Sequence, residues 1–135
     1  MIEVLKRIEA VSALGISLVS LTGEEAVVSI PLAGNRNDKG TFFAGSLSAA
    51  MVLAGWCLTM KLCSGREGRW EAVIKDSRVS FLRPVTGDCR AVARFRKPPL
   101  ERGEGRVAVF AEVSACDVSN RRCVLFHGEY RANRR

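Results

Sequence analysis

Histidine, tyrosine and paired cysteines are scarce in this sequence, and each scarcity argues against a class of protein. His127 is the only histidine and Tyr130 the only tyrosine. The five cysteines, at 57, 63, 89, 116 and 123, are odd in number and show no CxxC spacing. Because this pattern lacks zinc-ligand spacing, we expect no metal site. Unpaired thiols are typical of a reducing compartment, where buried cysteines act as small hydrophobic residues.

The chain also lacks a recognisable targeting segment. Its N-terminus is charged from Glu3 onward and has no apolar signal-peptide core, so we expect a cytoplasmic protein. The stretch from Thr41 to Met60 carries no charge and has about the length of a membrane span. It is rich in Gly, Ala, Ser and Thr rather than in Leu and Ile. A buried helix explains it better, and we expect no membrane association.

The remaining composition is that of a basic globular protein. The chain has 135 residues, the size of one domain, of which 47% are hydrophobic and 26% charged. The net charge is +7, and residues 83–135 hold 12 of the 21 Lys and Arg but only 6 of the 14 Asp and Glu. This excess suits an anionic partner such as a phosphate-bearing substrate, a membrane surface or nucleic acid. The lack of a helix-turn-helix, a zinc motif and an aromatic stacking platform makes nucleic acid the least favoured of them.

Hydrophobic patterning predicts two helices and six strands. Apolar residues at helical spacing, followed by Gly15, predict a first helix over residues 2–14. An apolar helix is predicted at about residues 44–63. Strands are predicted at 16–22, 25–32, 71–83, 88–97, 105–116 and 122–131. Because helices and strands do not alternate, we predict an α+β fold in a single domain over residues 1–135, with an antiparallel sheet covering the long central helix.

The loop before the central helix carries most of the chemistry. It reads Asn35-Arg36-Asn37-Asp38-Lys39-Gly40-Thr41-Phe42-Phe43 and enters the helix at Ala44-Gly45-Ser46-Leu47. A helix N-terminus has unpaired backbone N–H groups and a positive dipole, and such donors stabilise the oxyanion formed on a thioester carbonyl. Asn37 could orient a carbonyl or a water, Asp38 could act as general base, and Ser46 is a nucleophile only if a base reaches it. The alternative is an ordinary loop that ends in a helix cap at Thr41 or Ser46.

This loop, the following Leu53-Ala54-Gly55-Trp56 and the order of elements resemble the hotdog-fold thioesterase family typified by the C-terminal domain of the bacterial protein YiiD. Phe81-Leu82-Arg83-Pro84-Val85 is a second, looser match to a strand end of that fold. The resemblance covers essentially the whole chain. It implies a sheet wrapped around the helix, a homodimer or dimer of dimers with adjoining sheets, and an acyl thioester site at the dimer interface.

In the better-known acyl-CoA thioesterases of this fold, the corresponding stretch reads Asn-x-x-Gly-x-x-His-Gly-Gly. Asn37, Gly40 and Gly45 match it, whereas Phe43 replaces the histidine and Ala44 the first of the two glycines. Those enzymes also use a carboxylate further along the helix, and residues 49–58 contain none. A catalytic acid or base must therefore come from the loop or from a partner subunit.

The predicted site follows from these observations. We predict that the catalytic residues are Asn37, Asp38, Gly45 and Ser46, and that the substrate contacts are Asn35, Gly40, Thr41, Phe43 and Ala44. The basic strand face with Arg94 and Lys97 could hold the phosphates of coenzyme A or the acidic surface of an acyl carrier protein, or be an ordinary solvent-facing side.

The first functional prediction is a thioesterase that hydrolyses acyl-CoA or acyl carrier protein thioesters. The N-terminus of the central helix, around Ala44, Gly45 and Ser46, would stabilise the oxyanion. No cofactor is predicted, apart from coenzyme A as part of the substrate. The missing helix carboxylate leaves open a module that binds acyl thioesters without hydrolysing them.

Overall fold

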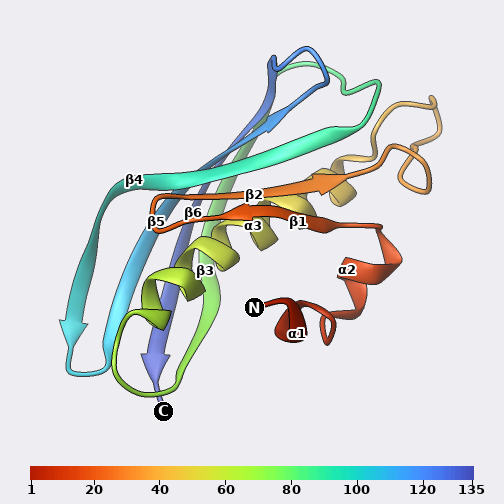
Figure 1. Cartoon of the computed structure of the whole chain (residues 1–135). Coiled ribbons are helices and arrows are strands. Elements are labelled where there is room, and N and C mark those ends of the chain that lie inside the picture. The colour runs from red at the N-terminus through yellow and green to blue at the C-terminus, as the bar shows by residue number, and fades with distance from the viewer.

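One curved antiparallel sheet wraps around one long helix in the computed structural model, which describes residues 1–135 (Figure 1). The strands lie in the order β1-β2-β4-β5-β6-β3, so β1 and β3 form the two edges. Their bounds are β1 Ser17–Leu21, β2 Glu25–Ile30, β3 Trp70–Phe81, β4 Cys89–Gly103, β5 Arg106–Cys116 and β6 Arg122–Arg134. The α+β class and the hotdog architecture are confirmed.

The central helix α3 (Ala44–Ser64) forms the middle of the core. It is long and apolar enough to cross a membrane by length and composition, but most of it is buried inside the fold. Some of the buried strand residues are small, such as Ala91 and Ala93, which lets the sheet approach the helix, whereas Phe126 and Tyr130 on β6 fill the core. Gly55 makes the closest approach, because a Cβ there would overlap the Tyr130 side chain on β6.

The N-terminal segment differs from the predicted single helix. It forms α1 (Ile2–Leu5) and α2 (Glu9–Ala13), with Ile8 between them in an extended conformation. Isolated helices of this length are marginal, so packing of Leu5, Ile8 and Val11 against the core decides their geometry. The predicted stop at Gly15 is confirmed: its φ is +72°, and its N–H donates to the Ser12 carbonyl at 3.2 Å.

Strand β4 continues beyond the predicted end at residue 97. It runs through Pro98 and Pro99 to Gly103 and pairs there with β5 alone, because β2 pairs only up to Arg94. The register shifts between Lys97 and Leu100, where the two prolines lie. Proline has no N–H to donate to a neighbouring strand. It is tolerated here because this stretch of β4 is irregular and has a neighbour on one side only.

Candidate functional site

The loop before α3 is held in shape by the side chain of Asn37. Its Oδ1 accepts the N–H groups of Lys39 (2.9 Å) and Thr41 (3.1 Å). Its Nδ2 donates to Thr41 Oγ1 (2.9 Å) and to the Phe42 carbonyl (3.3 Å). Gly40 completes the turn with φ +82°, a conformation that favours glycine. Asn37 therefore positions the loop, because its amide is already engaged there and is not free to orient a water.

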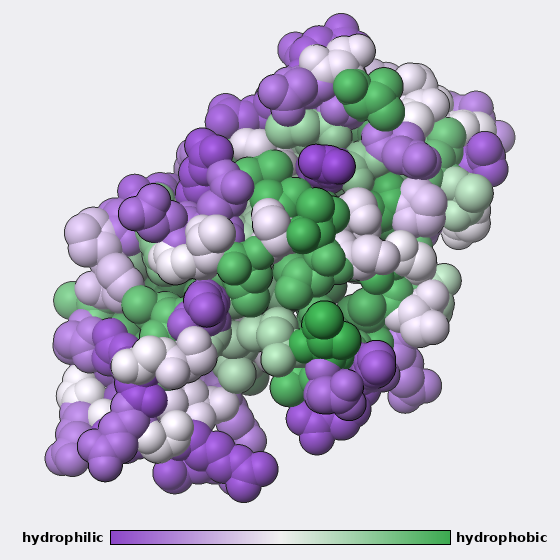
Figure 2. Space-filling model, in the orientation of Figure 1, coloured by the Kyte–Doolittle hydropathy of each residue, from purple (hydrophilic) through white to green (hydrophobic).

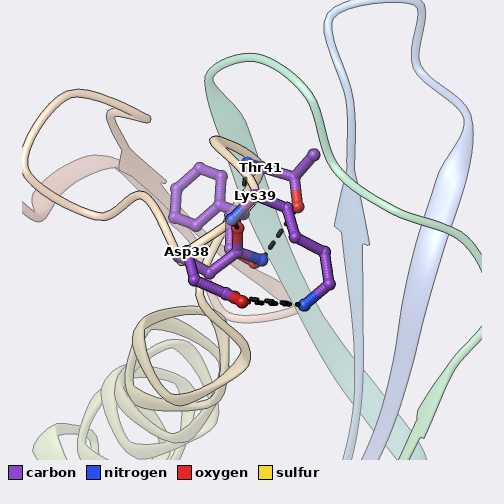
Figure 3. Close-up of polar contacts among 5 residues, drawn as sticks. Asp38, Lys39 and Thr41 are labelled. Carbon is purple, nitrogen blue, oxygen red and sulfur yellow. Dashed lines mark hydrogen bonds and ion pairs between the residues drawn. The ribbon is translucent and has the colours of Figure 1, made fainter.

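Asp38 lies exposed at the tip of this loop. Figure 3 shows its carboxylate directed toward the Lys39 ammonium, with 3.1 Å between Oδ1 and Nζ. Both side chains are more than three-quarters exposed, and an ion pair of this kind contributes at most about 1 kcal/mol. The Asp38 carboxylate is therefore accessible to water and only weakly held by Lys39.

The first turn of α3 leaves two backbone donors without an acceptor. The N–H groups of Ser46 and Leu47 both donate to the Phe43 carbonyl, at 3.1 and 3.2 Å. No hydrogen bond in the structure uses the N–H of Ala44 or Gly45. The predicted donor set of Ala44, Gly45 and Ser46 is therefore corrected to the first two. Helix termini leave such groups with a partial positive charge, which suits a developing oxyanion.

The ring of Phe43 occupies the approach to Gly45. A Cβ on Gly45 would overlap this ring, so glycine is what allows the contact. The Phe43 side chain is also 54% exposed, so the ring packs against the helix on one side only. The space beside Gly45 is thus filled by Phe43 in this structure.

Ser46 does not meet the condition for a nucleophile. The residue is buried, and its hydroxyl makes no hydrogen bond in the structure. The only imidazole, His127, lies on β6 with Nε2 at 3.1 Å from Glu112 Oε1 on β5. Since no base reaches Ser46, its role here is to pack beneath the first turn of α3.

A cavity of about 400 Å³ is lined in part by Ala44, the residue whose N–H is unused. The Phe42 N–H donates to the Val85 carbonyl at 2.9 Å and so ties the loop to the segment after β3. That segment includes Arg83, a permanent cation, and Leu82, which like Phe81 at the end of β3 is about half exposed. The lining residues are Asn37, Thr41, Phe42, Ala44, Leu47, Phe81, Leu82, Arg83, Pro84 and Val85.

The contribution of residues 81–85 to this cavity was not predicted from the sequence. Their motif indicated only a strand end of the fold. The cue that could have been used is a pair of large apolar residues followed directly by Arg83 and Pro84. Proline ends the pairing of a strand, so apolar residues just before it lie where the sheet stops and are left partly exposed.

Asn35, predicted as a substrate contact, serves the fold instead. It is buried, and its Nδ2 donates to the carbonyls of Leu14 and Pro31, each at 2.9 Å. Its Oδ1 is buried without a partner. Asn35 therefore ties the loop to the end of the N-terminal segment and to the end of β2.

Arg94 and Lys97 are not brought to the loop within this chain. Ala93 faces α3, so the neighbouring Arg94 projects from the opposite face of the sheet, where its Nε donates to Glu25 at 2.8 Å. The Lys97 ammonium lies 4.1 Å from the centroid of the Phe110 ring. Both predicted phosphate contacts therefore lie apart from the cavity beside Ala44.

The cysteines pack in the fold and offer no thiolate to the site. All five are free, and four are buried. Burial raises the pKa of the Cys57 thiol and of the Cys89 thiol to about 12, so both are neutral near pH 7. Cys57 and Cys63 on α3 are buried, as expected for cysteines that act as small hydrophobic residues.

Comparison with known proteins identifies the class to which this arrangement belongs. The profile of the family described as "Putative thioesterase (yiiD_Cterm)" matches residues 3–134, so this chain belongs to that family. The fold is similar to that of a "putative thioesterase" from Shewanella oneidensis, with a TM-score of 0.84, 30% identity, and 98% and 99% of the two chains covered.

Two further structures show the same fold at lower identity. A Pseudomonas aeruginosa protein described as a "Probable Thioesterase" has a TM-score of 0.80 at 22% identity, covering 100% of this chain and 97% of its own. The Escherichia coli PaaI protein, from the phenylacetic acid degradation operon, has a TM-score of 0.72 at 21% identity, covering 98% and 88%.

Proposed function

We propose that this protein hydrolyses acyl thioesters carried by coenzyme A or acyl carrier protein. The observation that carries the proposal is the pair of unused N–H groups at Ala44 and Gly45, of which Ala44 belongs to the cavity lining. Two fixed donors at a helix N-terminus match the needs of a tetrahedral intermediate, whose oxygen gains a full negative charge. Arg83 at the cavity is suited to a phosphate of the carrier, because a guanidinium stays charged and binds phosphate oxygens in pairs.

The reaction proceeds by attack of water on the thioester carbonyl carbon. Asp38 accepts the proton of the attacking water, and the carbonyl oxygen becomes an oxyanion on the donors of Ala44 and Gly45. Collapse of the intermediate breaks the carbon–sulfur bond, and the departing thiolate takes the proton from Asp38, which leaves a free acid and a free thiol. The Phe43 ring rotates away from Gly45 to admit the carbonyl. Asn37 keeps the loop in the shape that presents Asp38.

A homodimer through the edge strand β3 is part of this proposal. β3 pairs with β6 on one side only, and this edge strand also contains Val73, which is 61% exposed, and Ile74, which is 36% exposed. Open strand edges with apolar side chains are usually covered in native proteins. A second copy of the chain would extend the sheet and bring partner residues near the site. Five free thiols support a reducing, cytoplasmic location.

One observation favours a second candidate, a module that binds acyl thioesters without hydrolysing them. Residues 49–58 of α3 contain no carboxylate, and Asp38 lies on an exposed loop tip rather than in the cavity lining. A group so placed must come closer to the substrate before it can accept a proton. Without that movement, the same pocket would bind and retain the thioester.

Turnover and binding measured side by side separate the two functions. Acyl-CoA and acyl carrier protein thioesters are assayed by the loss of thioester absorbance, because the protein's own thiols react with thiol reagents. For a thioesterase, Asp38→Ala lowers kcat by roughly 100-fold or more and leaves the affinity for a non-hydrolysable thioether unchanged. Glu24→Ala removes another exposed carboxylate, in the turn between β1 and β2, and leaves both quantities unchanged. Binding without turnover in the wild type supports the binding module.

A further inference from the structure

The open face of α3 carries a stripe of residues that begins at the proposed oxyanion site. Gly45, Ala49, Val52 and Trp56 are spaced by four, three and four residues, so they lie along one side of the helix. Gly45 is exposed and the other three are half-buried, whereas most of the helix between them is buried. The stripe therefore runs from a free backbone N–H along the side of α3 that the sheet leaves uncovered.

An apolar groove of about 500 Å³ follows this stripe from Ala49 to Trp56, one helical turn beyond Gly45. Figure 2 shows hydrophobic residues gathered in the middle of the face on which α3 lies, with hydrophilic residues around them. All eleven residues that line the groove are hydrophobic, and they come from the N-terminal segment, α3, β3 and β6. They are Ile8, Ala10, Val11, Ile16, Ala49, Val52, Leu53, Trp56, Val73, Ile74 and Tyr130.

The polar side-chain atoms in this lining are already paired. The Tyr130 hydroxyl donates to the Val52 carbonyl at 2.7 Å, and Trp56 Nε1 donates to the Ala72 carbonyl at 3.0 Å. A ligand that buried a hydroxyl or a carboxylate here would lose its hydration without gaining a partner, which is strongly unfavourable. The groove therefore suits hydrocarbon and rejects polar groups.

We propose that this groove binds the acyl chain of the substrate and selects unsubstituted, straight-chain acyl groups of about twelve carbons. The proposal rests on the thioesterase function and names the substrate class for the same site. From Gly45 to Trp56 the helix advances eleven residues, or about 16 Å. A fully extended hydrocarbon advances about 1.25 Å per carbon, from bonds of ~1.52 Å and angles of ~111°, so about twelve to thirteen carbons span this length.

The homodimer proposed above meets the groove at Val73 and Ile74, which belong both to the β3 edge and to the lining. The competing occupant is therefore a second copy whose side chains fill the whole groove rather than only border its β3 side. The continuity of the stripe with the free N–H of Gly45 favours the acyl chain. A carbonyl held at Gly45 places its first methylenes beside Ala49, one turn further along the helix, and the end of the chain beside Trp56.

The test uses S-alkyl-pantetheines, since pantetheine is common to both carriers and a thioether cannot be hydrolysed. Calorimetry measures their affinity for the full chain as the alkyl group lengthens from four to sixteen carbons. We expect affinity to rise by up to about fourfold per methylene and to level off at about twelve carbons. A twelve-carbon chain that ends in a carboxylate binds at least about 100-fold more weakly than the plain chain.

Two matched variants locate the chain. Ala49→Phe fills the head of the groove and abolishes the dependence on chain length. Ala13→Phe adds the same side chain at an exposed position of α2 outside the groove and leaves the dependence intact. Affinity that does not depend on chain length in the wild type overturns the proposal. It is equally overturned if Ala49→Phe changes the oligomeric mass but not the dependence on chain length, because the groove is then an interface between copies.

These outcomes are distinct from a failure of the thioesterase function. A normal chain-length series with no hydrolysis of the corresponding acyl thioesters supports the groove and refutes the hydrolytic function. Hydrolysis with affinity that is independent of chain length supports the function and refutes the groove.

Discussion

Replacing Ala44 with proline deletes one proposed oxyanion donor without disturbing the helix that carries it. Ala44 is the first residue of α3, where proline is well tolerated because that N–H has no helical partner. The preceding Phe43 has φ −68° and ψ 128°, the extended conformation that a residue before proline adopts. Since no hydrogen bond uses the Ala44 N–H, folding loses nothing that the structure shows.

The expected effect on catalysis is large. Loss of one donor to an oxyanion typically lowers kcat by 10²–10³-fold, or about 3 kcal/mol of transition-state stabilisation. The free energy of unfolding of Ala44→Pro should stay within about 0.5 kcal/mol of the wild type, as for a neutral surface change. Steady-state hydrolysis of dodecanoyl-CoA gives kcat and KM, and urea denaturation gives the stability.

Two controls separate the donor from the bulk of the proline ring. Ala44→Val adds volume at the same place and keeps the N–H, so it should retain most of the activity. Glu9→Pro introduces proline at the first residue of α2, after the extended Ile8, and should leave kcat unchanged. A folded Ala44→Pro variant with wild-type kcat refutes the role of the Ala44 N–H. Equal losses in Ala44→Pro and Ala44→Val show that crowding, not the donor, is responsible.

Three further predictions concern the fold that holds this site. Gly55→Ala should destabilise the protein by about 3 kcal/mol in urea denaturation, because the new methyl group overlaps Tyr130; an unchanged midpoint refutes the close approach of α3 to β6. Asn35→Ala should cost about 2 kcal/mol through loss of its two hydrogen bonds to backbone carbonyls, with kcat of the folded fraction retained; a selective loss of kcat would return Asn35 to the substrate contacts. Burial raises the pKa of Cys57 and of Cys89 from 9.0 to about 12, so the stability that their neutral forms provide is complete below pH 9. It is lost as pH rises from 9 toward 12, by up to about 1.4 kcal/mol per pH unit for each thiol. The free energy of unfolding, measured by urea denaturation at each pH, should therefore fall less steeply across that range in Cys57→Ala than in the wild type. An equally steep fall in that variant contradicts the assignment.

Element types and the core were predictable because local patterns and tertiary packing agree there. The strands have one apolar face and α3 is apolar along most of its length. Only a sheet wrapped around the helix buries both. The prediction of a single N-terminal helix was wrong. In so short a segment helix propensity alone does not fix the conformation, and the packing of Ile8 against the core determines where the helix breaks. The predicted strand ends at residue 97, directly before Pro98 and Pro99, whereas β4 continues through them because it pairs there with β5 alone.

The sequence predicts the loop before α3 as the candidate site, and the structure changes the roles of several of its residues. The loop sequence predicted oxyanion donors at the start of α3, but only the structure shows that the Ser46 N–H already donates to the Phe43 carbonyl. Asn37 and Asn35 both carry amides that could bind substrate. The sequence does not tell which of these amides is already hydrogen-bonded within the fold, as both are in the structure. Arg83 was missed because its position beside the loop depends on a long-range contact between Phe42 and Val85.

Hydrolysis in water enriched in the heavy oxygen isotope tests the central claim most directly. The wild-type protein is given a twelve-carbon acyl thioester on coenzyme A and, separately, on acyl carrier protein, and the acid is analysed by mass spectrometry. Our account predicts catalytic formation of free thiol and of an acid with one heavy oxygen per turnover, with the rate strongly reduced in Ala44→Pro. Acid formation no faster than in buffer alone, on both carriers, contradicts it and leaves a protein that binds acyl thioesters without cleaving them.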